Sequence, residues 1–247
     1  MKFIITINFC LSCFFLIAQE DRFIGLIDGI LVEVNPFEPS VETIVDLNFD
    51  VDIRGTDMAY SVEDCLFYTI IDATNKPKLL SFDFLGNYNI IGEFSLFEGT
   101  IFVAEAIAYD EITGLMYISA SLDAHDFYSE SLLVVDVLNA ECSLVTQLDF
   151  LNGRRADMDN MVIHEQTLYF NDGQPGDDDT DHYELSLINL PSVTGVNQYF
   201  RAPYDASSDV VFFEDRLYYP TLERGLLTHN PQSPVETNVG FTHSNTE

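Results

Sequence analysis

The chain has 247 residues, and the 47% that are hydrophobic are enough to form a core and to exclude global disorder. The 41 acidic residues outnumber the 10 basic ones, which gives a formal net charge of −31. This charge repels nucleic-acid phosphates, so we expect no nucleic-acid partner. Tyr and Phe are abundant, and Gly and Pro are spread along the chain, a composition that favours short strands separated by turns.

Residues 1–18 are predicted to form a cleavable signal peptide. Lys2 precedes an apolar run from Phe3 to Ala18, which ends at a small residue and is followed by polar side chains. This run is marginal for a membrane span, and no later segment is both long and apolar enough to form one. We therefore expect no membrane span and a periplasmic or extracellular location, with residues 19–247 forming a single domain.

A repeat organises the rest of the chain. Four hairpin-like segments each end in a Tyr, and successive tyrosines are 49, 52 and 49 residues apart. A third and a fourth strand are predicted after each hairpin, and units of this length are typical of propeller blades. Such a sheet buries both of its faces when the units stack radially. The tyrosines are Tyr68, Tyr117, Tyr169 and Tyr218.

The sequence therefore predicts an all-β fold, a β-propeller of about five four-stranded antiparallel blades. The first copy begins at its second strand, residues 23–28, so its innermost strand must come from elsewhere. Two alternatives stay open: residues 241–247 form a weak closing strand, or the propeller is incompletely closed because the chain is a fragment. The third strands are predicted at residues 31–35, 79–83, 132–136, 185–189 and 226–230. The copies are predicted at residues 22–55, 56–103, 104–157, 158–206 and 207–247.

Two segments carry a resemblance to a known class of protein. Residues 108–117, Ala-Tyr-Asp-Glu-Ile-Thr-Gly-Leu-Met-Tyr, and residues 132–136, Leu-Leu-Val-Val-Asp, resemble the repeat of secreted bacterial β-propellers of the YVTN and WD-like classes. The Leu-Ile-Ala-Gln ending of the signal segment resembles that of proteins exported by Bacteroidota. The resemblance implies a fold and leaves the function open, since this architecture is found in binding proteins, scaffolds and enzymes alike.

An acidic residue stands near the start of each predicted innermost strand, where a propeller has the mouth of its central channel. Converging carboxylates repel one another unless a cation or an Arg compensates them. Arg54 and Arg155 lie in the preceding loops, so we predict a ligand-binding site at the mouth. The alternative is that these acids cap turns and pair locally with the arginines. The acids are Asp57, Glu105, Asp159 and Asp209.

Two acidic loops are predicted after the second strands of the third and fourth copies. Flexible, oxygen-rich loops suit Ca²⁺, which accepts six to eight oxygen ligands. Several of the acids alternate along the chain as in a calcium loop, although His182 stands where the helix-loop-helix calcium motif requires Gly. The alternatives are a calcium site and a solvated acidic loop. The candidate metal ligands are Asp123, Asp126, Asp172, Asp177, Asp179 and Asp181.

Cys65 and Cys142 are predicted to lie in turns on the same face of neighbouring blades. Such a placement permits a disulfide in an oxidising compartment without ensuring the short separation that a bridge needs. The alternative is two unrelated small hydrophobic residues.

The sequence contains no Gly-x-Ser-x-Gly, no His-Glu-x-x-His and no phosphate-binding glycine loop. We therefore expect an exported, non-enzymatic binding or scaffold protein. Its acidic loop face would bind a protein, a glycan or a small ligand, with calcium as a structural cofactor. The alternative, implied by similarity to propellers of the lactonase type, is a metal-dependent hydrolase with its metal at the channel mouth. The metal would then lie among Asp57, Glu105, Asp159, Asn160 and Asp209.

Overall fold

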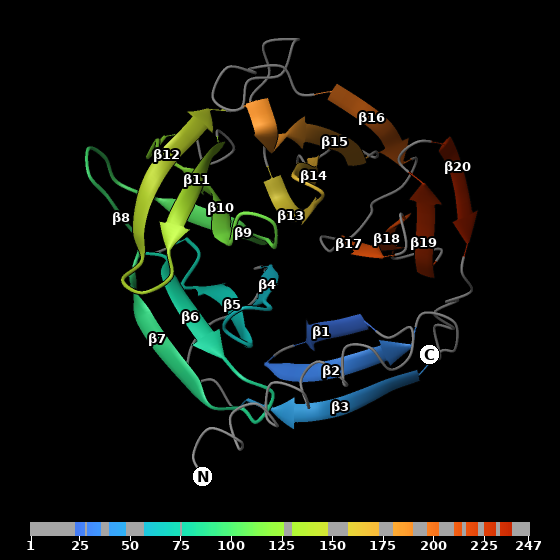
Figure 1. The fold of residues 1–247 in the computed structure, drawn as a ribbon, viewed down its shortest axis with the longest axis horizontal. Helices are drawn as coiled ribbons and strands as arrows, with labels where there is room; N and C mark the ends of the chain where they lie inside the picture. The colour runs from blue at the N-terminus through green and yellow to red at the C-terminus, as the bar shows by residue number, and fades with distance from the viewer. Residues whose placement is uncertain are drawn as a thin grey trace.

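The protein is almost entirely β-structure. The computed structural model describes residues 23–27, 29–35, 40–47, 57–74, 76–125, 130–147, 158–172, 180–189, 197–202, 210–213, 216–221, 225–230 and 233–238. Within these residues the strands form five separate sheets. Figure 1 shows the sheets arranged around a common centre, and in each sheet the strands joined by antiparallel pairing follow one another from the inside to the periphery.

Consecutive strands pair antiparallel in every sheet. The first sheet contains β1 (Phe23–Ile27), β2 (Ile30–Asn35) and β3 (Ser40–Asp46). The second contains β4 (Met58–Ser61), β5 (Leu66–Ile71), β6 (Lys78–Phe82) and β7 (Tyr88–Glu93). The fourth contains β13 (Met158–His164), β14 (Thr167–Asp172), β15 (Thr180–Ser186) and β16 (Asn197–Ala202). The fifth contains β17 (Val211–Phe213), β18 (Arg216–Thr221), β19 (Gly225–Asn230) and β20 (Ser233–Asn238).

The third sheet has an additional strand. Its antiparallel strands are β9 (Val103–Asp110), β10 (Leu115–Ser121), β11 (Glu130–Asp136) and β12 (Glu141–Gln147). The short strand β8 (Ser95–Leu96) follows β7 and pairs in parallel with β12. It thus ties the periphery of the second sheet to that of the third.

The predicted repeat is confirmed by the strand register. Each repeat tyrosine is the third residue of the second strand of its sheet. Across the hairpin, Tyr68 and Tyr117 face an Ala, whereas Tyr169 and Tyr218 face a Val. The four segments are therefore the same element in four successive sheets.

The apolar core lies between successive sheets. In β5, Phe67 packs in a cluster shared with the first sheet, whereas Ile70 packs in a cluster shared with the third. In β10, Ile118 belongs to the cluster shared with the second sheet and Tyr117 to the cluster shared with the fourth. Because successive side chains of a strand point to opposite faces, the apolar side chains of β5 and β10 cover both faces of the second and third sheets. Each fully buried Ile or Phe contributes about 1.5 to 3 kcal/mol.

Two strand predictions differ from the structure in the fourth sheet. The third strand, predicted at 185–189, is β15, which begins at Thr180, and Leu187–Asn189 is a 3-10 helix. Asp181 and His182, predicted to lie in an acidic loop, are strand residues opposite Asp172 and Asn171. The pairing of β14 with β15 continues toward the loop, and the pairs from Thr167 and Ser186 to Asp172 and Asp181 follow one another without a register shift.

The disulfide hypothesis is wrong, because Cys65 and Cys142 are free thiols. Cys65 lies in the hairpin turn between the inner strands β4 and β5, whereas Cys142 lies in β12 at the periphery (Figure 1). The two residues share a face but differ in distance from the centre. Cys142 is instead buried within the cluster between the second and third sheets.

The described part of the first sheet has three strands, in agreement with a first copy that begins at its second strand. The candidate closing segment, residues 241–247, lies outside the described residues.

Candidate functional site

The innermost strands β4, β9 and β13 meet at the residues where the acids were predicted. The backbone N–H of Asp57 donates to the carbonyl of Glu105 at 3.2 Å. The Asp57 carboxylate accepts hydrogen bonds from the N–H of Met58 at 2.7 Å and from the N–H of Met161, in the fourth sheet, at 3.1 Å. Its carbonyl accepts a hydrogen bond from the Thr69 hydroxyl at 2.8 Å. Asp57 therefore connects three sheets through its backbone and side chain.

A β-bulge lies at Glu105. Between the pair formed by Ile107 and Ile118 and the pair formed by Ala104 and Ala120, β9 has one residue more than β10. Bulges re-aim side chains and are frequent beside functional sites. The bulge interrupts the alternation of side-chain direction in β9 at Glu105, the acid predicted from the sequence.

A second bulge lies at Asp159. Met158 pairs with Asp172, and Asn160 pairs with Asn171, so Asp159 is the additional residue of β13. Glu105 and Asp159 thus occupy the same kind of irregularity in adjacent inner strands. Of the acids predicted at the mouth, Asp57 and Glu105 are joined through their backbones, and the Asp57 carboxylate bonds to Met161, two residues after Asp159 in β13. The remaining predicted residues, Asp209, Arg54 and Arg155, lie outside the described residues.

A buried polar network supports these strands. The Ser119 hydroxyl accepts a hydrogen bond from the Ala106 N–H at 3.0 Å and lies 3.2 Å from the Met158 carbonyl and 3.4 Å from Glu130 Oε1. Glu130 Oε2 accepts a hydrogen bond from the Met158 N–H at 2.6 Å. Ser119 and Glu130 are 0% and 2% exposed, so these groups depend on protein partners. The network joins the β9 bulge to the start of β13.

Ser119 and Glu130 were not predicted from the sequence. Glu130 is the first residue of β11 and stands two residues before its apolar run, and an acid beside such a run in a predicted strand was the available signal. Neither residue belongs to a sequence motif with a characteristic spacing. The contacts of Ser119 depend on the bulge, which shifts the register by one residue.

The predicted calcium ligands are only partly described. Asp123 is exposed, and its carboxylate accepts the His125 N–H at 2.8 Å in a local turn. Asp172 stands directly opposite Asp181, and Asp181 stands opposite Arg201 in the next strand. Like charges at facing positions destabilise a sheet unless they are compensated. Asp126, Asp177 and Asp179 lie outside the described residues. Within the described ranges, no three His, Cys, Asp or Glu side chains form a group that could hold a metal.

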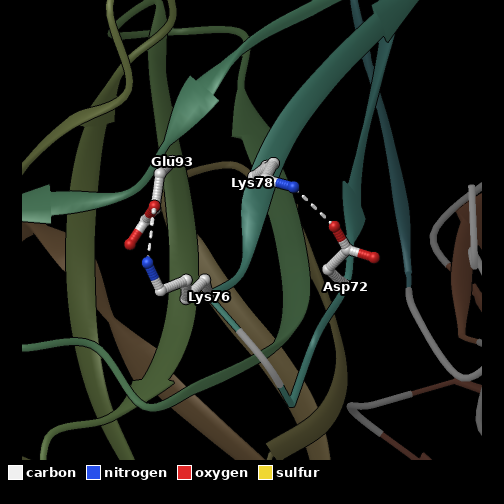
Figure 2. A network of polar contacts seen from close by, with 4 residues as sticks. All are labelled: Asp72, Lys76, Lys78 and Glu93. Carbon is white, nitrogen blue, oxygen red and sulfur yellow. Dashed lines mark hydrogen bonds and ion pairs between the residues drawn. The ribbon is translucent and has the colours of Figure 1, made fainter.

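In the second sheet, lysines compensate the acids beside the corresponding loop (Figure 2). Lys78 Nζ lies 2.7 Å from Asp72 Oδ2, and Lys76 Nζ lies 3.9 Å from Glu93 Oε2. Lys78 pairs with Ile71 in the register position that Asp181 occupies opposite Asp172 in the fourth sheet. The two equivalent loops therefore differ in charge at this position.

Burial changes the acidity of several groups away from this end. It raises the pKa of the Cys142 thiol to about 12. Burial, and secondarily the nearby Asp64 carboxylate, raises the pKa of Tyr68, whose hydroxyl donates to Asp64 at 3.1 Å. The pKa of Tyr117 is raised mainly by burial and then by Asp110. These groups are neutral near pH 7 and contribute packing there.

No family model and no curated protein matches the sequence. Among solved structures, the chain is similar to one from the nidogen/laminin complex, at 13% identity and a TM-score of 0.57, covering 87% of this chain and 76% of that one. It is also similar to a protein of unknown function from Bacteroides thetaiotaomicron VPI-5482, at 13% identity and a TM-score of 0.52. This match covers 84% of this chain and 52% of the other, so the chain spans about half the length of that relative.

A third similarity is to the tricorn protease, at 14% identity and a TM-score of 0.55, covering 91% of this chain and 22% of that one. At these identities the comparisons establish the fold alone. Within the described residues, the structure contains no helix with the length and hydrophobicity of a membrane span. The solved structures to which the chain is similar are β-propellers, and its repeated antiparallel sheets have the fold of that class.

Proposed function

We propose that the chain is an exported, non-enzymatic binding protein, built as a β-propeller of five blades. Its ligand, a protein, a glycan or a small molecule, would dock at the end of the central axis near Asp57, Glu105 and Asp159. The observation that carries this proposal is the convergence of three innermost strands at these acids, two of which lie at bulges. The bulges re-aim side chains at the place where a propeller offers a concave surface.

The hydrogen bonds of Asp57 favour a binding surface over a catalytic metal. Both carboxylate oxygens accept backbone N–H groups, one within β4 and one from β13. A carboxylate used in this way holds two strands together. The alternative, a metal-dependent hydrolase of the propeller lactonase type, needs Asp57, Glu105, Asp159, Asn160 and Asp209 to supply an ion with an open coordination position.

Calcium is proposed as a structural cofactor of the loops beside the ligand surface. The strand register sets Asp172 opposite Asp181, an arrangement that a cation would stabilise, and Arg201, opposite Asp181 in the next strand, is the alternative source of positive charge. Asp123, Asp126, Asp177 and Asp179 would complete the ligand set. Export through a signal peptide at residues 1–18 is consistent with this cofactor, because calcium is abundant outside the cell.

Metal analysis and a lactone hydrolysis assay of the purified protein test the choice between the two functions. The matched variants are Glu105→Gln at the axis and Asp181→Asn in the loop. The binding proposal expects calcium that Glu105→Gln retains and Asp181→Asn weakens, with no hydrolysis in any sample. A transition metal lost in Glu105→Gln, together with metal-dependent hydrolysis, would establish the enzyme instead.

A further inference from the structure

A cavity of about 420 Å³, open to solvent, lies at the opposite end of the inner strands. It is formed by Val62 and Glu63 from the turn between β4 and β5, and by Tyr109 and residues 111–114 at the turn between β9 and β10. Its volume is within the range of small-ligand pockets. The strands β4 and β9 begin at the acidic axial end, so their hairpin turns place this cavity away from the site proposed above.

The polar groups of the cavity converge. A Cβ atom added to Gly114 would lie 3.5 Å from Glu63 Oε2 and 3.9 Å from the Tyr109 hydroxyl, so both oxygens approach the same point. Gly114 has φ +71°, a conformation that side chains rarely adopt, and its lack of a Cβ keeps this point open. Within the described residues, the side chains of Glu63, Glu111 and Tyr109 make no hydrogen bond or ion pair to protein groups. The lining thus presents acceptors that are available to a ligand around one space.

The lining is also one-sided in charge and partly apolar. Among the described residues that form it, there are two carboxylates and no Lys, Arg or His. Val62 and Ile112 supply an aliphatic wall, and the Ile112 side chain is 63% exposed and therefore open to contact with a ligand. A group that satisfies this lining needs a positive charge with several N–H donors at the end of an aliphatic stem. A primary alkylammonium group has three such donors, and its stem packs on apolar surface while its head stays polar.

We propose that this cavity is a binding site for a primary alkylammonium group, either the side chain of a lysine in a partner polypeptide or a free alkylamine. Glu63 and Glu111 pair with the ammonium, the Tyr109 hydroxyl accepts one of its N–H groups, and Val62 and Ile112 contact the stem. The proposal does not depend on the axial ligand surface, because none of its residues belongs to that surface.

The test is an NMR titration of the ¹⁵N-labelled chain with three probes. The first is Nα-acetyl-lysine-N-methylamide, and the second is the norleucine derivative, which has a similar aliphatic side chain without the ammonium. The third is n-butylammonium chloride. We expect the amide signals of Glu63, Thr113 and Gly114 to shift with the two cationic probes, and the amide of Met161 at the axial end to stay unchanged. An equal dissociation constant for the norleucine derivative would overturn the proposal.

Charge variants provide the second arm. Glu63→Gln and Glu111→Gln should each raise the dissociation constant of the lysine probe about threefold, and the double variant about tenfold. Both side chains are exposed, so the fold should tolerate these changes. Glu98→Gln, at an exposed turn outside the cavity, is the matched control and should leave the constant unchanged. An unchanged constant in the double variant would overturn the proposal.

The probes also identify the source of the ammonium group. A lower dissociation constant for the lysine derivative than for n-butylammonium assigns the cavity to a polypeptide side chain, because the added contacts come from the peptide groups. Equal constants support a free alkylamine as the ligand. Signal shifts confined to residues outside the cavity would refute both versions.

Discussion

Replacing Ser119 with Ala should destabilise the protein far more than a serine substitution at its surface. The Ser119 hydroxyl accepts the Ala106 N–H at 3.0 Å, and the Met158 carbonyl lies 3.2 Å away, within reach as its acceptor. All three residues are 0% exposed, so water cannot replace the lost oxygen without structural change. The substitution changes the side-chain volume little, and its cost therefore comes from the unsatisfied groups.

The magnitude follows from the number of groups left without a partner. A buried donor or acceptor that loses its hydrogen bond costs about 1 to 3 kcal/mol. The Ala106 N–H loses its acceptor directly, while the loss at Met158 is smaller because its N–H keeps Glu130. We therefore expect a loss of about 2 kcal/mol, which lowers the melting temperature by about 4 to 8 °C in a chain of this size.

Urea denaturation followed by circular dichroism measures this difference. Ser143→Ala is the matched control, because Ser143 is exposed on β12, and it should change the free energy of unfolding by less than about 0.5 kcal/mol. Glu130→Gln should be non-additive with Ser119→Ala, by at least about 0.5 kcal/mol, because both act on Met158. If Ser119→Ala is as stable as Ser143→Ala, the network does not support the inner strands as inferred.

Three further predictions concern protonation and thiol chemistry. Because the pKa of Tyr68 is raised in the folded state, the stability that its neutral form contributes is present below about pH 10 and lost above it. Tyr68→Phe should therefore reduce the fall in stability between about pH 10 and 11 in an alkaline denaturation series; an identical fall would refute this. Desolvation raises the pKa of Asp83, but hydrogen bonds to its carboxylate from the Asn87 side chain and from the backbone N–H groups of Asn87 and Leu85 outweigh it and lower the pKa. The stability that these bonds contribute is present above about pH 4 and lost as the pH falls through the lowered pKa. Asp83→Asn should therefore lower the free energy of unfolding by about 0.5 to 1 kcal/mol at pH 7 and by nothing near pH 2. An equal loss at both pH values would contradict this. Burial raises the pKa of Cys142 to about 12, so in the native mature protein at pH 8 a disulfide reagent should modify Cys65 and spare Cys142. After unfolding without reductant both thiols should react, and finding none would restore the disulfide.

The sequence was sufficient to predict the repeat. Tyr68 and its three counterparts occupy the same position in strands of the same alternation. The register of each strand is fixed because one residue of slippage would turn its apolar side chains to the wrong face. Spacing alone could thus locate the hairpins. The same periodicity placed Asp57 and Glu105 at the start of inner strands, where the structure has them.

The bulges and the buried network could not be predicted in this way. A bulge adds one residue to a single strand, and no local signal distinguishes Glu105 or Asp159 from acids in a regular strand. Glu130 becomes a partner of Met158 only after two sheets have packed together. Asp181 was assigned to a loop because its neighbours are acidic and turn-forming, whereas pairing across the hairpin extended β15 to Thr180.

Thermal unfolding in calcium chloride, compared with sodium chloride of matched ionic strength, tests most directly whether this chain is a calcium-supported binding propeller. The folded chain crowds 41 acidic residues, so both salts should raise its melting temperature by screening. A calcium site in the native loops should add about 2.7 kcal/mol when the calcium concentration is about 100-fold above the dissociation constant. Replacing Asp177, Asp179 and Asp181 with Asn should abolish this increment and leave the effect of sodium chloride nearly unchanged. Equal melting temperatures in the two salts would contradict the calcium site, and an increment lost instead in Glu105→Gln would place the ion on the axis and favour the hydrolase.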